Sequence, residues 1–231
     1  MHENLIFLTS EGHIPDPLPN GESLKQFIDR EMGWWNSKIN WDPTGQLQRD
    51  VVYSEFINRI ETNSNINLRD KNYFAGKTVG ELCGGAKGGL LCHDDLFSSA
   101  SERIQIDILA SEFAKLNLKE VATVDKWVTC PAEKILLKDD SIDFLIAFNS
   151  LDHGWDFRAS ITEAIRVAKE GVISFDCKGY TDGGSHYQLI VYEEVVNFLE
   201  NFKYLHYWEW RPYPSHSDDE NLRTIEFHWK K

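Results

Sequence analysis

The glycine-rich segment that follows residue 83 has the residue types that most directly suggest chemistry. A short apolar run, 78–83, leads into Gly84, Gly85, Gly88 and Gly89, and a helix is expected after them. At such a strand-to-helix turn, residues without Cβ let a ligand approach the backbone, and the helix N-terminus offers N–H groups. The segment therefore predicts a site for a nucleotide-like ligand. A tight turn in some other α/β protein is the alternative.

Asp107 supplies a second group to this predicted site. It ends another short apolar run, 103–107, and follows the glycines at a spacing of about 20 residues. At that spacing an acidic side chain can accept hydrogen bonds from both hydroxyls of a bound ribose. A helix N-cap is the structural alternative for Asp107, and the two roles are compatible.

Two other nucleotide-binding motifs fit this region less well. Gly76-Lys77-Thr78 resembles the end of a P-loop, but Lys71 stands where that motif requires its first glycine, and the triplet precedes the strand. A dinucleotide-binding motif that starts at Gly84 meets Ala86 in place of its second glycine. A nicotinamide-dependent oxidoreductase stays an alternative for the glycine loop alone.

Further along the chain, the segments 131–153 and 164–175 complete an ordered series with the glycine loop and Asp107. In this order they resemble the class I S-adenosylmethionine-dependent methyltransferases, specifically the methyltransferase type 11-like domain. The first segment is similar to that family's acidic stretch running into strand four, and the second to its next helix and strand five. The likeness covers about residues 77 to 178. It implies S-adenosylmethionine as cofactor and an α/β fold with a doubly wound, mainly parallel seven-stranded sheet.

The resemblance also implies which residues contact the cofactor. Glu81 matches the acidic residue near its amino-acid end, Asp107 would hold the ribose, and Asn149 ends strand four. The complete implied set is Glu81, Cys83, Gly84, Gly85 and Gly88 in the loop, Asp107, the adenine-flanking Ala132 and Glu133, and Asn149.

The loop departs from the family pattern, which has glycines two, four and six residues after the acidic residue. Here those positions hold Cys83, Gly85 and Lys87. The loop is therefore either shifted by one residue or less able to bind the cofactor. This irregularity favours a second hypothesis, a non-catalytic methyltransferase-like binding module.

Methyl transfer from a sulfonium is an in-line displacement, so the protein must align the acceptor and manage one proton. His153, with Asp152 beside it after strand four, is the predicted catalytic base because imidazole titrates near neutral pH. Packing or capping of the following helix is the alternative role of His153. His186 is a weaker candidate for contact with the acceptor.

Aromatic residues near the N-terminus are candidates for stacking on the acceptor or on the sulfonium, since aromatic faces attract cations. They are Trp34, Trp35 and Tyr53, and burial in the core is their alternative role. No metal site is predicted, because the adjacent ligand-type residues of 92–95 cannot all converge on one ion from a helix.

The elements that must position these residues follow an alternation of strand and helix patterns from residue 77 onward. Expected strands are 78–83, 103–108, 121–124, 142–149, 171–176, 204–210 and 223–229, the last two forming an antiparallel pair, and expected helices include 111–116 and 158–169. A helical face is expected within 46–61. We therefore predict an N-terminal helical cap, 1–70, and a cofactor-binding core, 71–231.

Composition restricts the partners. The 24 Lys and Arg residues against 37 Asp and Glu residues give a net charge of −13, which disfavours a nucleic-acid substrate. The four cysteines show no paired spacing, and neither a signal peptide nor a membrane-spanning run is seen, so a cytoplasmic protein is expected. The predicted function is methylation of a hydroxyl or amine on a small molecule or glycan. The oligomeric state is not predicted.

Overall fold

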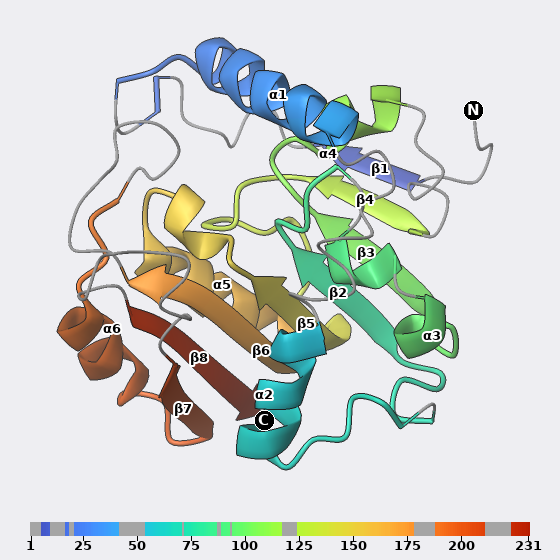
Figure 1. The fold of residues 1–231 in the computed structure, drawn as a ribbon, viewed down its shortest axis with the longest axis vertical. Helices are drawn as coiled ribbons and strands as arrows, with labels where there is room; N and C mark the ends of the chain where they lie inside the picture. Colours follow the sequence, from blue (N-terminus) through green and yellow to red (C-terminus); the bar gives the residue numbers. More distant parts are fainter. Residues whose placement is uncertain are drawn as a thin grey trace.

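The computed structural model describes residues 6–9, 17–18, 21–41, 54–70, 72–86, 89–92, 94–116, 124–177, 188–210 and 223–231. Their strands form one sheet in the order β1-β4-β3-β2-β5-β6-β8-β7 (Figure 1). The parallel strands are β1 (Ile6–Thr9), β2 (Thr78–Leu82), β3 (Glu102–Ile106), β4 (Lys126–Thr129), β5 (Ile142–Phe148) and β6 (Ala168–Cys177). The antiparallel strands are β7 (Leu205–Trp210) and β8 (Arg223–Lys230).

This sheet confirms the predicted fold class, a doubly wound, mainly parallel α/β sheet. The strands β2, β3 and β5 to β8 correspond to predicted strands, and β1 adds a strand that pairs in parallel with β4. The expected strand at 121–124 stays a prediction, and the strand that the structure describes in this region, β4, begins at Lys126, where pairing with Ile104 of β3 starts. Residues 121–123 lie outside the described ranges.

Helices cover both faces of the sheet, as its buried residues require. On one face lie α1 (Leu24–Trp41), α2 (Ser54–Ser64), α3 (Asp94–Phe97) and α4 (Ala110–Phe113), and on the other α5 (Phe157–Val167) and α6 (Tyr192–Leu199). The helix α5 begins where the Asp156 side chain accepts the N–H groups of Arg158 and Ala159 at 3.0 and 3.2 Å. It buries Ile161, Ala164 and Ile165 against the sheet. The predicted helices at 111–116 and 158–169 are thereby confirmed, the first as α4 continued by a short 3₁₀ turn.

The N-terminal residues contribute to the sheet and to one of its apolar faces. The helix α2 buries Phe56, Ile57 and Ile60, which confirms part of the helical face expected within 46–61, whereas residues 42–53 are not described. Arg59 of α2 reaches the fully buried Glu226 of β8, with its Nη2 2.7 Å from Oε1. The division into a cap, 1–70, and a core, 71–231, stays a prediction. Within the described ranges, no helix has both the length and the apolar composition that a membrane crossing needs.

Candidate cofactor site

The loop that follows β2 has an unusual backbone. Cys83 has a φ of 57° and Gly85 a φ of 80°, and the Cys83 N–H donates to the Ile106 carbonyl at 2.7 Å. A left-handed conformation is uncommon for a residue with a side chain and is typical of functional sites. Ser150, which follows β5, donates from its Oγ to the Leu82 carbonyl at 3.3 Å. The ends of β2, β3 and β5 are therefore tied together at this loop.

The helix expected after the glycines is present only as two short helical segments. The chain forms a short 3₁₀ helix, η3 (Gly89–Cys92), and then the four-residue helix α3. Gly89 has a φ of 51°, which an α-helix does not allow. The Glu81 carboxylate accepts the N–H groups of Leu90 at 2.9 Å and Leu91 at 3.0 Å, and so binds η3 to β2.

Glu81 therefore lies beneath the loop and is almost completely buried. Burial raises the pKa of its carboxyl to about 8, and the two backbone hydrogen bonds oppose this increase. Its predicted contact with the amino-acid end of the cofactor stays a prediction. Gln105 of β3, which the sequence did not indicate, lies beside Glu81 in register and is fully buried. A Cβ on Gly84 would stand 2.5 Å from Gln105 Nε2 and 2.6 Å from Glu81 Cδ, so both side chains end under the loop.

Asp107 lies immediately after β3 and faces the glycine loop. Its carboxylate accepts the N–H of Gly85 at 3.3 Å and that of Leu109 at 2.8 Å. The second bond, just before α4, satisfies the capping alternative, and the first brings Asp107 beside the predicted cofactor loop. Burial raises the pKa of Asp107 to about 6, against the effect of the two hydrogen bonds. The two parts of the predicted nucleotide site are thus adjacent.

Glu133 is directed toward the turn that precedes α5. Its Oε1 accepts the N–H groups of Trp155 at 2.7 Å and Asp156 at 3.2 Å, and burial raises the pKa of the carboxyl. Ala132 beside it is buried. The segment after β4 is therefore attached to the segment after β5, and this brings both predicted adenine-flanking residues to the edge where β2 and β3 end.

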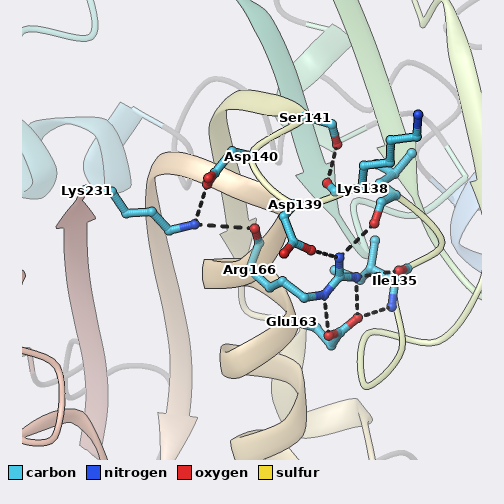
Figure 2. A network of polar contacts seen from close by, with 9 residues as sticks. Ile135, Lys138, Asp139, Asp140, Ser141, Glu163, Arg166 and Lys231 are labelled. Atoms are coloured by element: carbon cyan, nitrogen blue, oxygen red, sulfur yellow. Dashed lines mark hydrogen bonds and ion pairs between the residues drawn. The ribbon is translucent and has the colours of Figure 1, made fainter.

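Arg166 of α5 holds the remainder of this acidic segment (Figure 2). Its guanidinium donates to the carboxylates of Glu163 and Asp139 at 2.7 Å, and to the carbonyls of Ile135 and Leu137 at 2.7 and 2.9 Å. A planar guanidinium with five donors can satisfy such a set of oxygens at once. The segment 135–139 is thereby held against α5.

Asn149, Asp152 and His153 follow β5 at the same edge of the sheet. Asn149 is exposed, has a φ of 48°, and donates its N–H to the Ser174 carbonyl at 2.8 Å. In the 3₁₀ helix η6 (Leu151–His153), Asp152 is only 2% exposed, whereas His153 is partly exposed. The side chain of Asp152 is thus enclosed by the protein, whereas that of His153 is partly exposed to solvent. Their roles in catalysis stay predictions.

Some predicted residues lie outside the described ranges, namely Gly88, Tyr53 and His186. Trp35 of α1 lies against Gly85, and Trp34 is 52% exposed. In the part of the chain that the structure describes, no three His, Cys, Asp or Glu side chains are placed to bind a metal.

Residues 83–175 match the profile of a family described as "Methyltransferase domain". The match includes the segment 131–153, which a nicotinamide-dependent oxidoreductase would leave unexplained. Together with the fold, this match over part of the chain agrees with the predicted resemblance to the class I methyltransferases. The predicted resemblance to a methyltransferase domain is thereby confirmed.

Solved structures with the same fold have low sequence identity to this chain. The YcgJ protein of Bacillus subtilis has a TM-score of 0.52 and 17% identity, over 71% of this chain and 96% of that chain. Phosphoethanolamine N-methyltransferase 2 of Haemonchus contortus, solved with phosphomonomethylethanolamine and S-adenosylhomocysteine, has a TM-score of 0.54 and 14% identity, over 80% and 60%. The CurJ carbon methyltransferase has a TM-score of 0.53 and 14% identity, over 80% and 57%. No curated protein matches the sequence.

Proposed function

We propose that this chain transfers a methyl group from S-adenosylmethionine to a hydroxyl or amine of a small molecule or glycan. The observation that carries the proposal is the contact between the two cofactor elements, the Gly85 N–H and the Asp107 carboxylate, at 3.3 Å. A glycine backbone and a carboxylate at neighbouring strand ends suit a ribose and the chain attached to it. The net charge of −13 supports an acceptor other than nucleic acid.

In this proposal, different residues at the carboxyl edge of the sheet contact different parts of the cofactor. Asp107 accepts hydrogen bonds from the ribose hydroxyls, and Ala132 and Glu133 flank the adenine. Glu81 lies near the amino-acid end of the cofactor, and Asn149 contacts the cofactor from the end of β5. The cofactor supplies an electrophilic methyl group, and the protein aligns the acceptor with it. His153 takes the proton that an attacking hydroxyl or amine must lose.

A non-catalytic binding module is the second candidate function. The observation that favours it is the replacement of a regular helix after the glycine loop by η3, whose Leu90 and Leu91 N–H groups already bind Glu81. A cofactor that approaches this loop finds fewer N–H groups than a regular helix N-terminus would offer.

Calorimetric titration with S-adenosylmethionine and with S-adenosylhomocysteine tests the first candidate. We expect both to bind, and Asp107→Asn to weaken both. Asp139→Asn is the matched control, because Asp139 is largely exposed on the segment held by α5. Binding by the intact chain, together with methyl transfer to a member of a panel of small hydroxyl and amine acceptors, supports an enzyme. Binding without transfer to any acceptor favours the module, and absence of binding at millimolar ligand contradicts the cofactor assignment.

A further inference from the structure

The side chain of Trp35 occupies the space beside Gly85 that a Cβ would fill in any other residue. A Cβ built on Gly85 would stand 2.2 Å from Cη2 and 2.3 Å from Cζ2 of Trp35. These distances are far below van der Waals contact, so the six-membered ring of the indole lies directly on the Gly85 backbone. In the proposed function this same surface of the glycine loop must receive the cofactor.

Other aromatic contacts hold the Trp35 indole in this position. Its ring lies edge-on to Phe113 of α4, with 5.6 Å between centroids, and Phe113 in turn lies 6.4 Å from Trp127 of β4. On the outer side, Trp34 packs edge-on against Trp35 at 4.8 Å. Edge-to-face pairs at these separations are attractive. Figure 1 shows α1 running past α4, consistent with this contact.

A residue of the same helix also lies near Asp107. This carboxylate is 6% exposed, although the proposed function requires it to meet a ribose. Glu31 of α1 is close enough for its negative charge to add to the effect of burial in raising the pKa of Asp107. Arg30 holds Glu31, with its Nη1 2.6 Å from Oε1. The helix therefore places the Trp35 indole on the glycine loop and a second acidic side chain, Glu31, near Asp107.

We propose that α1 is a gate on the cofactor site, in which the Trp35 indole occupies the surface of Gly85 and must leave before the cofactor binds. This inference rests on the proposed function, since it assumes that S-adenosylmethionine uses the glycine loop. The closed state then competes with the cofactor. The apparent dissociation constant of the cofactor equals its intrinsic value divided by the fraction of molecules in the open state, so it rises as that fraction falls. The gate thus limits cofactor affinity, although Trp35 makes no contact with the bound cofactor.

The test compares the cofactor affinity of the intact chain with that of Trp35→Ala, measured by calorimetry with S-adenosylhomocysteine. We expect the variant to bind about tenfold more tightly or better, because removal of the indole favours the open state. Lys25→Ala is the matched control on the same helix, because the Lys25 side chain is 83% exposed, and the affinity of this variant should stay within about twofold of that of the intact chain. Trp35→Phe retains an aromatic ring for packing but lacks the atoms nearest to Gly85. Trp35→Phe should also bind S-adenosylhomocysteine more tightly than the intact chain does. This variant provides the test if Trp35→Ala does not fold.

Hydrogen exchange of the intact chain gives an independent measurement. The amides of α1 should exchange faster when the cofactor is saturating, because the helix leaves its contacts with α4. Slower exchange in α1, or weaker binding by the Trp35 variants, would show that the indole packs on the bound cofactor and would overturn the gate. Equal affinity of the variants and the intact chain would also overturn it. In these cases the proposed function stands, whereas absence of binding by the intact chain and by all variants overturns both proposals.

Discussion

The ion pair between Arg59 of α2 and Glu226 of β8 connects the N-terminal residues to the C-terminal strand. Its removal tests how strongly α2 is bound to the sheet. Glu226 is 0% exposed and Arg59 is 14% exposed. The carboxylate accepts from Arg59 Nε and Nη2 at 2.9 and 2.7 Å, from Ser174 Oγ at 3.1 Å and from Trp208 Nε1 at 2.8 Å. The proposed variant is Arg59→Met, because methionine replaces the apolar stem of arginine with an unbranched apolar side chain and removes the charge.

The expected cost follows from the burial of the partner. Removal of one member of a buried ion pair leaves an uncompensated charge and typically costs about 3–5 kcal/mol. For a chain of this size, such a loss lowers the melting temperature by roughly 6–20 °C. The double variant Arg59→Met with Glu226→Gln should regain part of the loss, because a neutral amide is cheaper to bury than a lone carboxylate.

Urea unfolding, followed by tryptophan fluorescence and circular dichroism, measures these free energies. Arg69→Met is the matched control, since Arg69 pairs with Glu61 at a site where the arginine side chain is 43% exposed. The control should cost less than about 1 kcal/mol. If Arg59→Met costs no more than this control, our account of the buried pair is refuted. An early separate transition in Arg59→Met would instead indicate that α2 unfolds independently of the sheet, as an autonomous cap would.

Further predictions concern single residues of the site and the sheet. The raised pKa of Glu81 means that its contribution to stability is full below about pH 4.5 and is lost as the pH rises through about 8. Between pH 7 and 9 the intact chain should therefore lose roughly 1–2 kcal/mol of unfolding free energy that Glu81→Gln does not lose, and parallel pH curves would contradict this. Cofactor affinity should fall as the pH drops below about 6, where Asp107 takes up a proton and accepts hydrogen bonds less well. This dependence should be absent in Asp107→Asn. His153→Ala should lower turnover and leave cofactor affinity unchanged, and normal turnover in steady-state assays would exclude His153 as the base. Gly171→Ala should cost about 3 kcal/mol in urea unfolding, because the new Cβ would stand 2.3 Å from Trp229, and an unchanged midpoint would refute the packing argument.

Local sequence patterns predicted most of the sheet and the order of its site segments. Short apolar runs ending in Asp107 and Asn149 mark strands whose carboxyl ends share one edge, because parallel strands joined by crossovers point the same way. The glycine loop, Asp107 and the segment 131–153 could therefore be assigned to one site before their contacts were known. The family match over residues 83–175 confirms that this order is informative.

Local sequence patterns predicted an element less well where its formation depends on pairing with a distant part of the chain. The strand expected at 121–124 falls largely on residues that the structure does not describe, and the described strand β4 begins at Lys126, where its pairing with β3 starts. The strand β1 could not be predicted, since its four residues form a strand through pairing with β4, far along the chain. The expected helix after the glycines is short and tight because Glu81 binds its first N–H groups.

The sequence by itself indicated which residues are candidates for binding a nucleotide-like cofactor, and that they follow strands of one mainly parallel sheet. These properties depend on residue type and on the periodicity of apolar residues along each segment. Only the tertiary structure decided that Trp35 lies on Gly85 and that Arg59 pairs with Glu226, 167 residues away. Such contacts depend on how distant surfaces pack, and no local pattern records which surface a side chain will meet.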